Sequence, residues 1–166
     1  MQMPDPVRPA DDDARALAQS LMASARFAAL GVLLDDGSPL VTRVAFGLDP
    51  QGGPVSLISG LSLHTAALGQ RPACSLLVGE PEGKGDPLAH PRLSLMCRAR
   101  FISRQGPEHE TLAAHYLRRQ PKAKLYLQLA DFTFVRFAVT GAHLNGGFGK
   151  AFRLAAADLQ HSGGTG

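Results

Sequence analysis

One early segment of the chain places apolar residues at helical intervals. Its six apolar positions fall at i, i+3, i+4, i+7, i+8 and i+11, and they are Ala14, Leu17, Ala18, Leu21, Met22 and Ala25. Aspartates at positions 11–13 stand at the start of this stripe, where carboxylates stabilise the positive end of a helix dipole. The pattern predicts an amphipathic helix that begins near residue 11.

Most of the remaining pattern is typical of short β-strands separated by turns. Turn-forming residues, mainly Gly, Pro and Asp, gather at 35–39, 49–53 and 79–87. The apolar and alternating segments between the turns predict strands at 27–34, 40–48, 55–59, 73–78, 93–103 and 132–144. Further helical segments are predicted at 63–70, 106–121 and 154–159.

Short turns between the first three strands predict an antiparallel meander. Because strands outnumber helices, the pattern favours a mainly β fold, a closed barrel plugged by helices, over a doubly wound sheet. The length of 166 residues fits one domain, since domains commonly run about 100–200 residues. We expect a flexible N-terminal lead at 1–13, a folded domain at 14–160 and a flexible tail at 161–166.

Composition narrows the class of protein. Hydrophobic residues make up 45% of the chain and charged residues 19%, which argues against global disorder. The chain has no Trp and only 6% aromatic residues, so we expect a largely aliphatic core. The net charge of +3 is too small to argue for a nucleic-acid partner, and no apolar run approaches the ~18 residues of a membrane span.

Two cysteines, Cys74 and Cys97, match neither a disulfide framework nor a zinc motif. The N-terminus lacks the apolar segment of a signal peptide. We therefore expect a cytoplasmic protein with reduced thiols. A basic cluster at Arg118, Arg119, Lys122 and Lys124 has two interpretations, a solvated helix face or a rim that guides an anionic ligand to a pocket.

Familiar catalytic motifs fail on spacing. The segment from Gly79 to Lys84 is one residue short of a phosphate-binding loop, and Gly85 follows the lysine in place of Ser or Thr. His109 and His115 would lie about 240° apart on a helix, so they cannot share a metal ion. No Ser, Cys or Thr stands in a nucleophile motif, so the sequence gives hydrolysis no support.

Two features together predict an anion site. Arg43 lies inside the otherwise apolar strand 40–46, where a charge needs a partner, although an outward-facing arginine at a sheet edge is the alternative. Ser62 is a good N-cap for the following helix, whose first turn holds His64 and Thr65. Backbone N–H groups at a helix N-terminus bind anions, and an arginine adds a bidentate fork. The alternative for His64 and Thr65 is that they are ordinary polar residues of a first helical turn.

The sequence resembles the pyridoxamine 5′-phosphate oxidase-like, FMN-binding split-barrel superfamily, and within it the haem-utilisation branch. The resemblance runs from about Ala14 to Leu159. Six segments carry it through their order and spacing. They are 40–44; 58–59 with 64–65; 72–78; 85–88 with 91–95; 131–132; and Gly146-Gly147-Phe148-Gly149-Lys150-Ala151.

The resemblance implies a six- to seven-stranded antiparallel split β-barrel with flanking helices. It also implies a homodimer with two FMN sites at the interface, each built by both subunits. The residues that match the family's FMN-binding positions are Arg43, Val44, Ala45, Phe46, Ile58 and Ser59. His64 and Thr65 match its phosphate-binding pair, and Arg92 and the segment around Phe148 match positions near the flavin ring.

Several departures from the family bear on function. Thr65 and Leu93 stand where the oxidase commonly has a basic residue and a Gln, so less positive charge would meet the phosphate. The oxidase's C-terminal substrate signature, with Trp, Arg and His, has no counterpart in this sequence, which argues against oxidation of pyridoxamine phosphate. Haem-degrading relatives usually carry an extra C-terminal domain with a haem-linked His, whereas here only His161 lies in the tail.

We therefore expect an FMN-binding flavoprotein with oxidoreductase activity on a small molecule that the sequence does not identify. One alternative is a haem-binding or haem-degrading protein on the same barrel, with His90, His115 or His143 approaching the iron. The other alternative is a non-enzymatic dimeric barrel that has lost its affinity for the cofactor.

Overall fold

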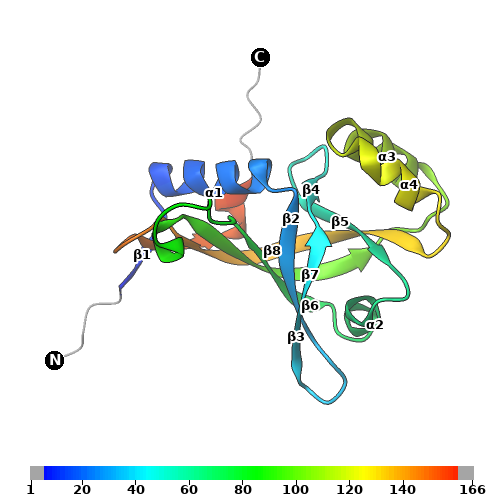
Figure 1. Ribbon diagram of the computed structural model, residues 1–166, viewed down its shortest axis with the longest axis horizontal. Coiled ribbons are helices and arrows are strands. Elements are labelled where there is room, and N and C mark those ends of the chain that lie inside the picture. Colours follow the sequence, from blue (N-terminus) through cyan, green and yellow to red (C-terminus); the bar gives the residue numbers. More distant parts are fainter. Residues whose placement is uncertain (1–5, 161–166) are drawn as a thin grey trace.

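The computed structural model describes residues 6–160, shown as a ribbon in Figure 1. Within this range the strands are β1 (Val7–Pro9), β2 (Phe27–Leu33), β3 (Pro39–Ala45), β4 (Gly47–Leu48), β5 (Pro54–Ser59), β6 (Ala73–Val78), β7 (Arg92–Phe101), β8 (Phe132–Asn145) and β9 (Ala151–Ala155). The helices are α1 (Asp12–Ser24), α2 (Leu63–Gln70), α3 (Pro107–Arg119) and α4 (Lys124–Leu127). The mainly β class is confirmed, as are the helices predicted near residues 11, 63 and 107.

Six strand positions close into a ring. β2 pairs with β3 on one side and with β6 on the other, and β7 and β8 follow β6. β8 then pairs with β5, and β5 pairs with β4, which continues the path of β3 after Phe46. All of these pairings are antiparallel, so the predicted barrel is confirmed. The predicted meander is also confirmed, because the predicted strand 40–48 pairs with β2 through β3 and with β5 through β4, antiparallel in both cases.

The barrel is split along β8. The first part of this strand, 132–136, pairs with β5, whereas its last part, 141–145, pairs with β9. Residues 137–140 lie between the two partners, and none of the described strands pairs with them on this edge. Both partners continue away from the sheet at this point, which leaves an opening between them.

Two strands extend the sheet beyond the predicted number. β9 pairs with β8, and β1 pairs with β9 in parallel, so the sheet has nine strands within residues 6–160 rather than six or seven. The predicted flexible lead at 1–13 therefore contains a strand, and the helical turn predicted at 154–159 begins as the end of β9 and becomes 3₁₀ at Ala156–Leu159. The sequence pattern missed β1 and β9 because both strands are short and are defined by pairing with distant segments, which local patterns do not encode. The predicted tail at 161–166 lies outside the described residues.

Two hydrophobic clusters hold the fold together. α1 begins with the Asp11 carboxylate accepting a hydrogen bond from the Ala14 amide at 2.7 Å, and it buries Ala18 and Met22 in the larger, mainly aliphatic cluster inside the barrel. Full burial of an aliphatic side chain contributes about 1.5–3 kcal/mol. A smaller cluster, partly aromatic, joins β5 and β8 to α3, and Figure 1 shows α3 and α4 together at the end of the molecule away from α1.

The two cysteines lie directly opposite each other on β6 and β7, and both are buried free thiols. Burial raises the pKa of Cys74 to about 11 and also raises the pKa of Cys97. Because the thiolate is the reactive form, neither side chain has the character of a nucleophile.

We expect both thiols to be inert in the folded protein. At pH 8, Ellman's reagent should label less than about one tenth of the thiols over an hour, because burial limits access and disfavours the thiolate. The same protein in guanidinium chloride should release two equivalents of thionitrobenzoate rapidly, which provides the control. Rapid labelling of either cysteine before unfolding would contradict the buried register of β6 and β7.

Across residues 6–160, no helix combines the length and apolar character needed to cross a bilayer. The same stretch of chain contains no group of three or more His, Cys, Asp or Glu side chains placed to hold a metal ion.

Candidate functional site

A cavity of about 370 Å³ opens between the barrel wall and the α3–α4 segment. One wall comes from β3, β5 and the N-terminus of α2. The other comes from the end of α3, the following turn, α4 and the start of β8. Its lining residues are Arg43, Val44, Ala45, Leu57, Ile58, Ser59, Ser62, His64, Tyr116, Gln120, Lys122, Ala123, Tyr126 and Phe132. This volume is at the lower end of the range for small-molecule pockets, about 300–1,000 Å³.

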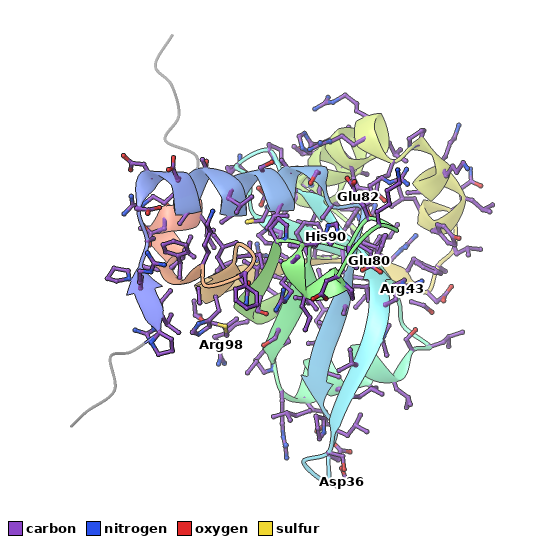
Figure 2. The ribbon with its side chains drawn as sticks, turned by 60° about the vertical axis from the view of Figure 1, so that its left-hand side comes forward. Asp36, Arg43, Glu80, Glu82, His90 and Arg98 are labelled. Carbon is purple, nitrogen blue, oxygen red and sulfur yellow. The ribbon has the colours of Figure 1, made fainter. Side chains whose placement is uncertain are left out.

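A cationic residue lines each wall of the cavity, Arg43 on one and Lys122 on the other. The Arg43 guanidinium lies 5.2 Å from the centroid of the Phe27 ring, and within the described residues it has no hydrogen-bonded or ion-paired partner. Figure 2 shows Arg43 on the outer side of the ribbon, where it also borders a groove shared with Glu80 and Arg92. On the opposite wall, Lys122 comes from the 3₁₀ turn Pro121–Ala123. Both residues line the cavity, and the Arg43 guanidinium lies over Phe27, a residue of the outer groove.

The first turn of α2 contributes a buried histidine. His64 is only 8% exposed; its Nδ1 lies 3.0 Å from the Thr42 hydroxyl, while its buried Nε2 has no partner. Ser62, the N-cap, makes no capping hydrogen bond with its side chain. The amides of Ser62 and Thr65 already donate to the carbonyls of Ser59 and Ser62, which leaves those of Leu63 and His64 without a described backbone acceptor. Unused donors and the positive end of the α2 dipole thus meet at one end of the cavity.

Burial lowers the pKa of His64 below its ordinary value of about 6.5. In the folded state the imidazole is therefore harder to protonate than in the unfolded chain. The stability that this difference contributes is fully present above about pH 6.5 and is lost as the pH falls below that value.

We expect the free energy of unfolding to decrease between pH 7.5 and pH 5.5, and to decrease less in His64→Gln. Urea unfolding at both pH values measures this slope. The pKa of His109 is also lowered by burial, so part of the slope should remain. His143→Gln, at an exposed histidine, is the matched control and should keep the wild-type slope. If His64→Gln had the same pH dependence of unfolding as the wild type, burial of the His64 imidazole would not be the source of that dependence.

Apolar and aromatic side chains form the body of the cavity. The rings of Tyr126 and Phe132 lie 5.1 Å apart between centroids. The Tyr116 hydroxyl donates to Gln120 Oε1 at 3.2 Å, and Gln120 Nε2 donates to the Phe46 carbonyl at 2.6 Å. Burial raises the pKa of Tyr116 to about 12, so this phenol remains protonated at neutral pH. Gln120 thereby joins the end of α3 to the link between β3 and β4.

The structure brings six of the nine predicted site residues to this cavity: Arg43, Val44, Ala45, Ile58, Ser59 and His64. The other three lie elsewhere. Phe46 is fully buried in the core, and the Thr65 hydroxyl donates to the Ser59 carbonyl at 2.6 Å. The Arg92 guanidinium donates to the carbonyls of Leu88 and His90 at 3.1 and 3.3 Å and borders the outer groove.

Ser59 lines the cavity but its hydroxyl is already engaged. Its Oγ donates to Asp131 Oδ2 at 2.7 Å and accepts from the Leu61 amide at 3.1 Å. The Gly60 amide also donates to the Asp131 carbonyl, at 2.6 Å. Asp131 thus fixes the connection between β5 and α2. This connection sets the position of His64 in the first turn of α2.

The residues of the basic cluster at 118–124 lie in different surroundings. Lys122 lines the cavity, whereas Arg119 donates to the Ala23 carbonyl at 2.9 Å and Arg118 lies 3.0 Å from His115 Nδ1. The aromatic wall at Tyr116, Tyr126 and Phe132 was missed by sequence reasoning. The signal that could have found it is the proximity of these residues in sequence to Lys122.

None of the three histidines considered as iron ligands lines the cavity. His90 Nε2 lies 2.9 Å from the Lys84 carbonyl, His115 contacts Arg118, and His143 is on the far half of β8. His64 is the cavity's own histidine, and its Nε2 is buried. The residues present therefore fit an anionic group next to a flat apolar body better than they fit iron.

Comparison with known proteins agrees with the fold. No protein-family model matches the sequence. The chloroplast non-canonical heme oxygenase HOZ of Arabidopsis thaliana is 30% identical over 118 residues, which are 70% of this chain and 35% of HOZ. The protein Atu2129 of Agrobacterium tumefaciens, of unknown function, is 37% identical with a TM-score of 0.78, over 91% of this chain and 61% of its own.

Two further solved structures extend the comparison. A heme-binding protein of Mycobacterium smegmatis is 28% identical with a TM-score of 0.80, over 92% of this chain and 61% of its own. A Clostridium acetobutylicum protein of the pyridoxinephosphate oxidase family is 12% identical with a TM-score of 0.66, over 90% of this chain and 99% of its own, and it shares the fold. The chain thus spans about a third of HOZ and 61% of both Atu2129 and the M. smegmatis protein. The chain therefore has the split-barrel fold of the pyridoxinephosphate oxidase family protein, and its relatives include two proteins that are named for haem, HOZ and the M. smegmatis protein.

Proposed function

We propose that the cavity binds FMN and that the protein is a flavoprotein with oxidoreductase activity. The observation that carries this proposal is the joining of two environments in one cavity. Arg43, Ser62 and the first turn of α2 form an anion-binding end, and the apolar wall continues from it to Tyr116 and Phe132. A phosphate monoester on a flat aromatic body has the same two-part chemistry.

Arg43 would donate to two phosphate oxygens through its planar guanidinium. The Ser62 hydroxyl and the amides of the first turn of α2 would donate to the others. Because Asp131 already holds the Ser59 hydroxyl, Ser59 would fix the turn instead of contacting the phosphate. This division of roles follows from the hydrogen bonds that each side chain already makes.

Backbone groups of Val44 and Ala45 border the cavity and would meet the polar edge of the flavin ring. FMN supplies hydride and electron transfer when it is bound, so the protein needs no nucleophile of its own. The chain's own contribution would be to orient the ring and exclude water with the aromatic wall. Tyr116, a protonated phenol tied to Gln120, would keep that wall in place.

A second copy of the chain would complete the site. Three apolar residues that neighbour its lining residues in sequence face solvent in the single chain: Leu61, before α2, is 88% exposed, Leu63, at the start of α2, 68%, and Leu125, on α4, 65%. Val41, also 69% exposed, extends this apolar character along β3 next to Arg43. Solvent-exposed apolar patches of this kind mark interaction sites. We therefore include a homodimer with shared cofactor sites in the proposal, in a cytoplasmic setting that keeps the thiols reduced.

The visible spectrum of freshly purified protein tests the proposal. We expect flavin absorption bands that bleach on reduction with dithionite, and release of FMN on denaturation. FMN titrated into stripped protein should lose fluorescence in a saturable way. A colourless protein that does not quench FMN fluorescence would contradict the proposal and support a barrel without a cofactor.

Haem binding is the second candidate, because the names of HOZ and of the M. smegmatis protein refer to haem. Haem shares the flat apolar body and the anionic groups of FMN. It would also require a ligand to iron, and in this cavity the His64 Nε2 would first have to become accessible. A Soret band that forms on addition of haem and survives excess FMN would favour this function over the flavin.

A further inference from the structure

The opening in the split barrel forms a second cavity. It has a volume of about 730 Å³, and it shares no lining residue with the cofactor cavity. The β4–β5 turn at 49–54 forms one side and residues 156–160 form the other, while the edge of β8 at 137–139 lies between them. We call this cavity the β8 slot.

The edge of β8 inside the slot has unused hydrogen-bonding capacity. β5 ends its pairing at Arg136 and β9 begins at Gly141. No described strand pairs with 137–140 from this side, whereas β7 pairs with 137–139 on the other edge and Thr140 lies at a β-bulge. An unpaired strand edge presents N–H and C=O groups that another extended chain can complete. The four residues span about 13 Å, which is room for three or four extended residues.

The two faces of the slot differ in chemistry. Toward the core, Met22, Phe137 and Leu159 form an apolar floor. Toward solvent, the slot carries three arginines, Arg98, Arg100 and Arg136. Because successive side chains of a strand point to opposite faces, a strand added here would place alternate residues against the floor and against the arginines.

One of these arginines is available for a new partner. Arg100 and Arg136 lie opposite each other on β7 and β8, and Glu108 bridges them at 2.8 and 3.0 Å. Arg136 also pairs with Asp49. Arg98, by contrast, is exposed and has no ion-paired partner among residues 6–160, and it lies opposite Ala138 on β8 and Ala73 on β6. Figure 2 shows Arg98 on the outer side of the sheet, far from Arg43.

We propose that the β8 slot binds an extended peptide segment of a partner protein with the pattern apolar–acidic–apolar. Its backbone adds a short strand to the free edge of β8. Its acidic side chain pairs with Arg98, and its apolar neighbours pack on the floor. This binding does not depend on a cofactor in the first cavity.

Fluorescence anisotropy with a labelled peptide, Gly-Gly-Val-Glu-Val-Gly-Gly amide, tests the proposal on the full chain. We expect saturable binding, about tenfold weaker for the peptide with Gln in place of Glu and for the variant Arg98→Gln, since a charge-assisted hydrogen bond is lost in each. Arg118→Gln, at an exposed arginine outside the slot, should bind like the wild type. A peptide N-methylated at Glu and at both Val residues should also bind more weakly, because it lacks the N–H groups that an added strand donates to β8.

Amide hydrogen exchange locates the peptide independently. We expect slower exchange at 137–140 when the Glu peptide is present, with little change at 43–46 in the cofactor cavity. Absence of saturable binding would overturn the proposal. So would binding that is equal for the Glu and Gln peptides and leaves exchange at 137–140 unchanged. Neither measurement uses FMN, so the results of both are independent of the test of the flavin site.

Discussion

Arg43→Ala is expected to weaken FMN binding by about 10- to 100-fold. Arg43 lines the proposed anion-binding end of the cavity, and its guanidinium has no competing ion-paired partner in residues 6–160. A hydrogen bond to a charged group contributes roughly 1.5–3 kcal/mol, which corresponds to this range of affinity. Titration of FMN into stripped protein, followed by fluorescence quenching or calorimetry, measures the change.

Two controls separate a lost phosphate contact from a damaged fold. Arg43 is exposed and its one described contact is with the Phe27 ring, so the melting temperature of Arg43→Ala should stay within a few degrees of the wild type. Arg43→Lys should recover part of the affinity, because it restores the charge without the fork. Riboflavin, which lacks the phosphate, should bind wild type and Arg43→Ala alike. Equal FMN affinity in wild type and Arg43→Ala would show that the phosphate lies elsewhere.

Local sequence patterns predicted the elements of the fold well because most of them depend on local physics. The α1 stripe is buried as expected, and Asp11 caps the helix. Strand β6 has the bounds predicted from its alternating residues. Patterns failed at β9 and β1, whose pairing joins residues more than 140 positions apart. A three-residue strand such as Val7–Pro9 carries no periodicity, so its partner alone defines it.

The candidate site shows the same division between local and distant information. Arg43 and His64 were found because each is chemically unusual in its own segment, a charge in an apolar strand and a polar ring in a first helical turn. The opposite wall was missed, since nothing local to Tyr116 or Gln120 indicates that the end of α3 returns to β3. The Gln120 bond to the Phe46 carbonyl, across 74 positions of sequence, creates that wall. Arg92 was placed near the ring by resemblance, and its guanidinium instead bonds to its own loop.

The two proposed sites occupy separate cavities of the barrel. The cofactor cavity depends on α3 and α4, which form a wall that the barrel itself lacks. The β8 slot depends on a different feature, an edge of β8 at 137–140 with which none of the described strands pairs. A partner peptide at the slot would contact the strand β8 whose first residue, Phe132, lines the cofactor cavity. Strand β8 is therefore common to the two proposed sites, although neither site depends on the other.

Phe134→Ala is expected to destabilise the protein by about 3–5 kcal/mol, the usual cost of removing a buried aromatic ring. Phe134 is fully buried at the centre of the smaller cluster. Its ring centroid lies 5.3 Å from that of Tyr116, edge to face, and 5.5 Å from that of His109. Natural domains are stable by about 5–15 kcal/mol, so this loss is a large fraction of the total. Urea unfolding at pH 7.5 measures it.

The same ring holds the wall of the cofactor cavity in position. Tyr116 and Leu57 belong to the Phe134 cluster and line that cavity, so Phe134→Ala should also weaken FMN binding under conditions where the variant remains folded. Phe148→Ala is the matched control, because Phe148 is fully exposed and its loss should change the free energy of unfolding by less than about 0.5 kcal/mol. Equal effects of the two substitutions would contradict the packing of α3 on β8. A large loss of stability with unchanged FMN affinity would instead separate this cluster from the site, and the ligand would then have to rest on the β3 and α2 side alone.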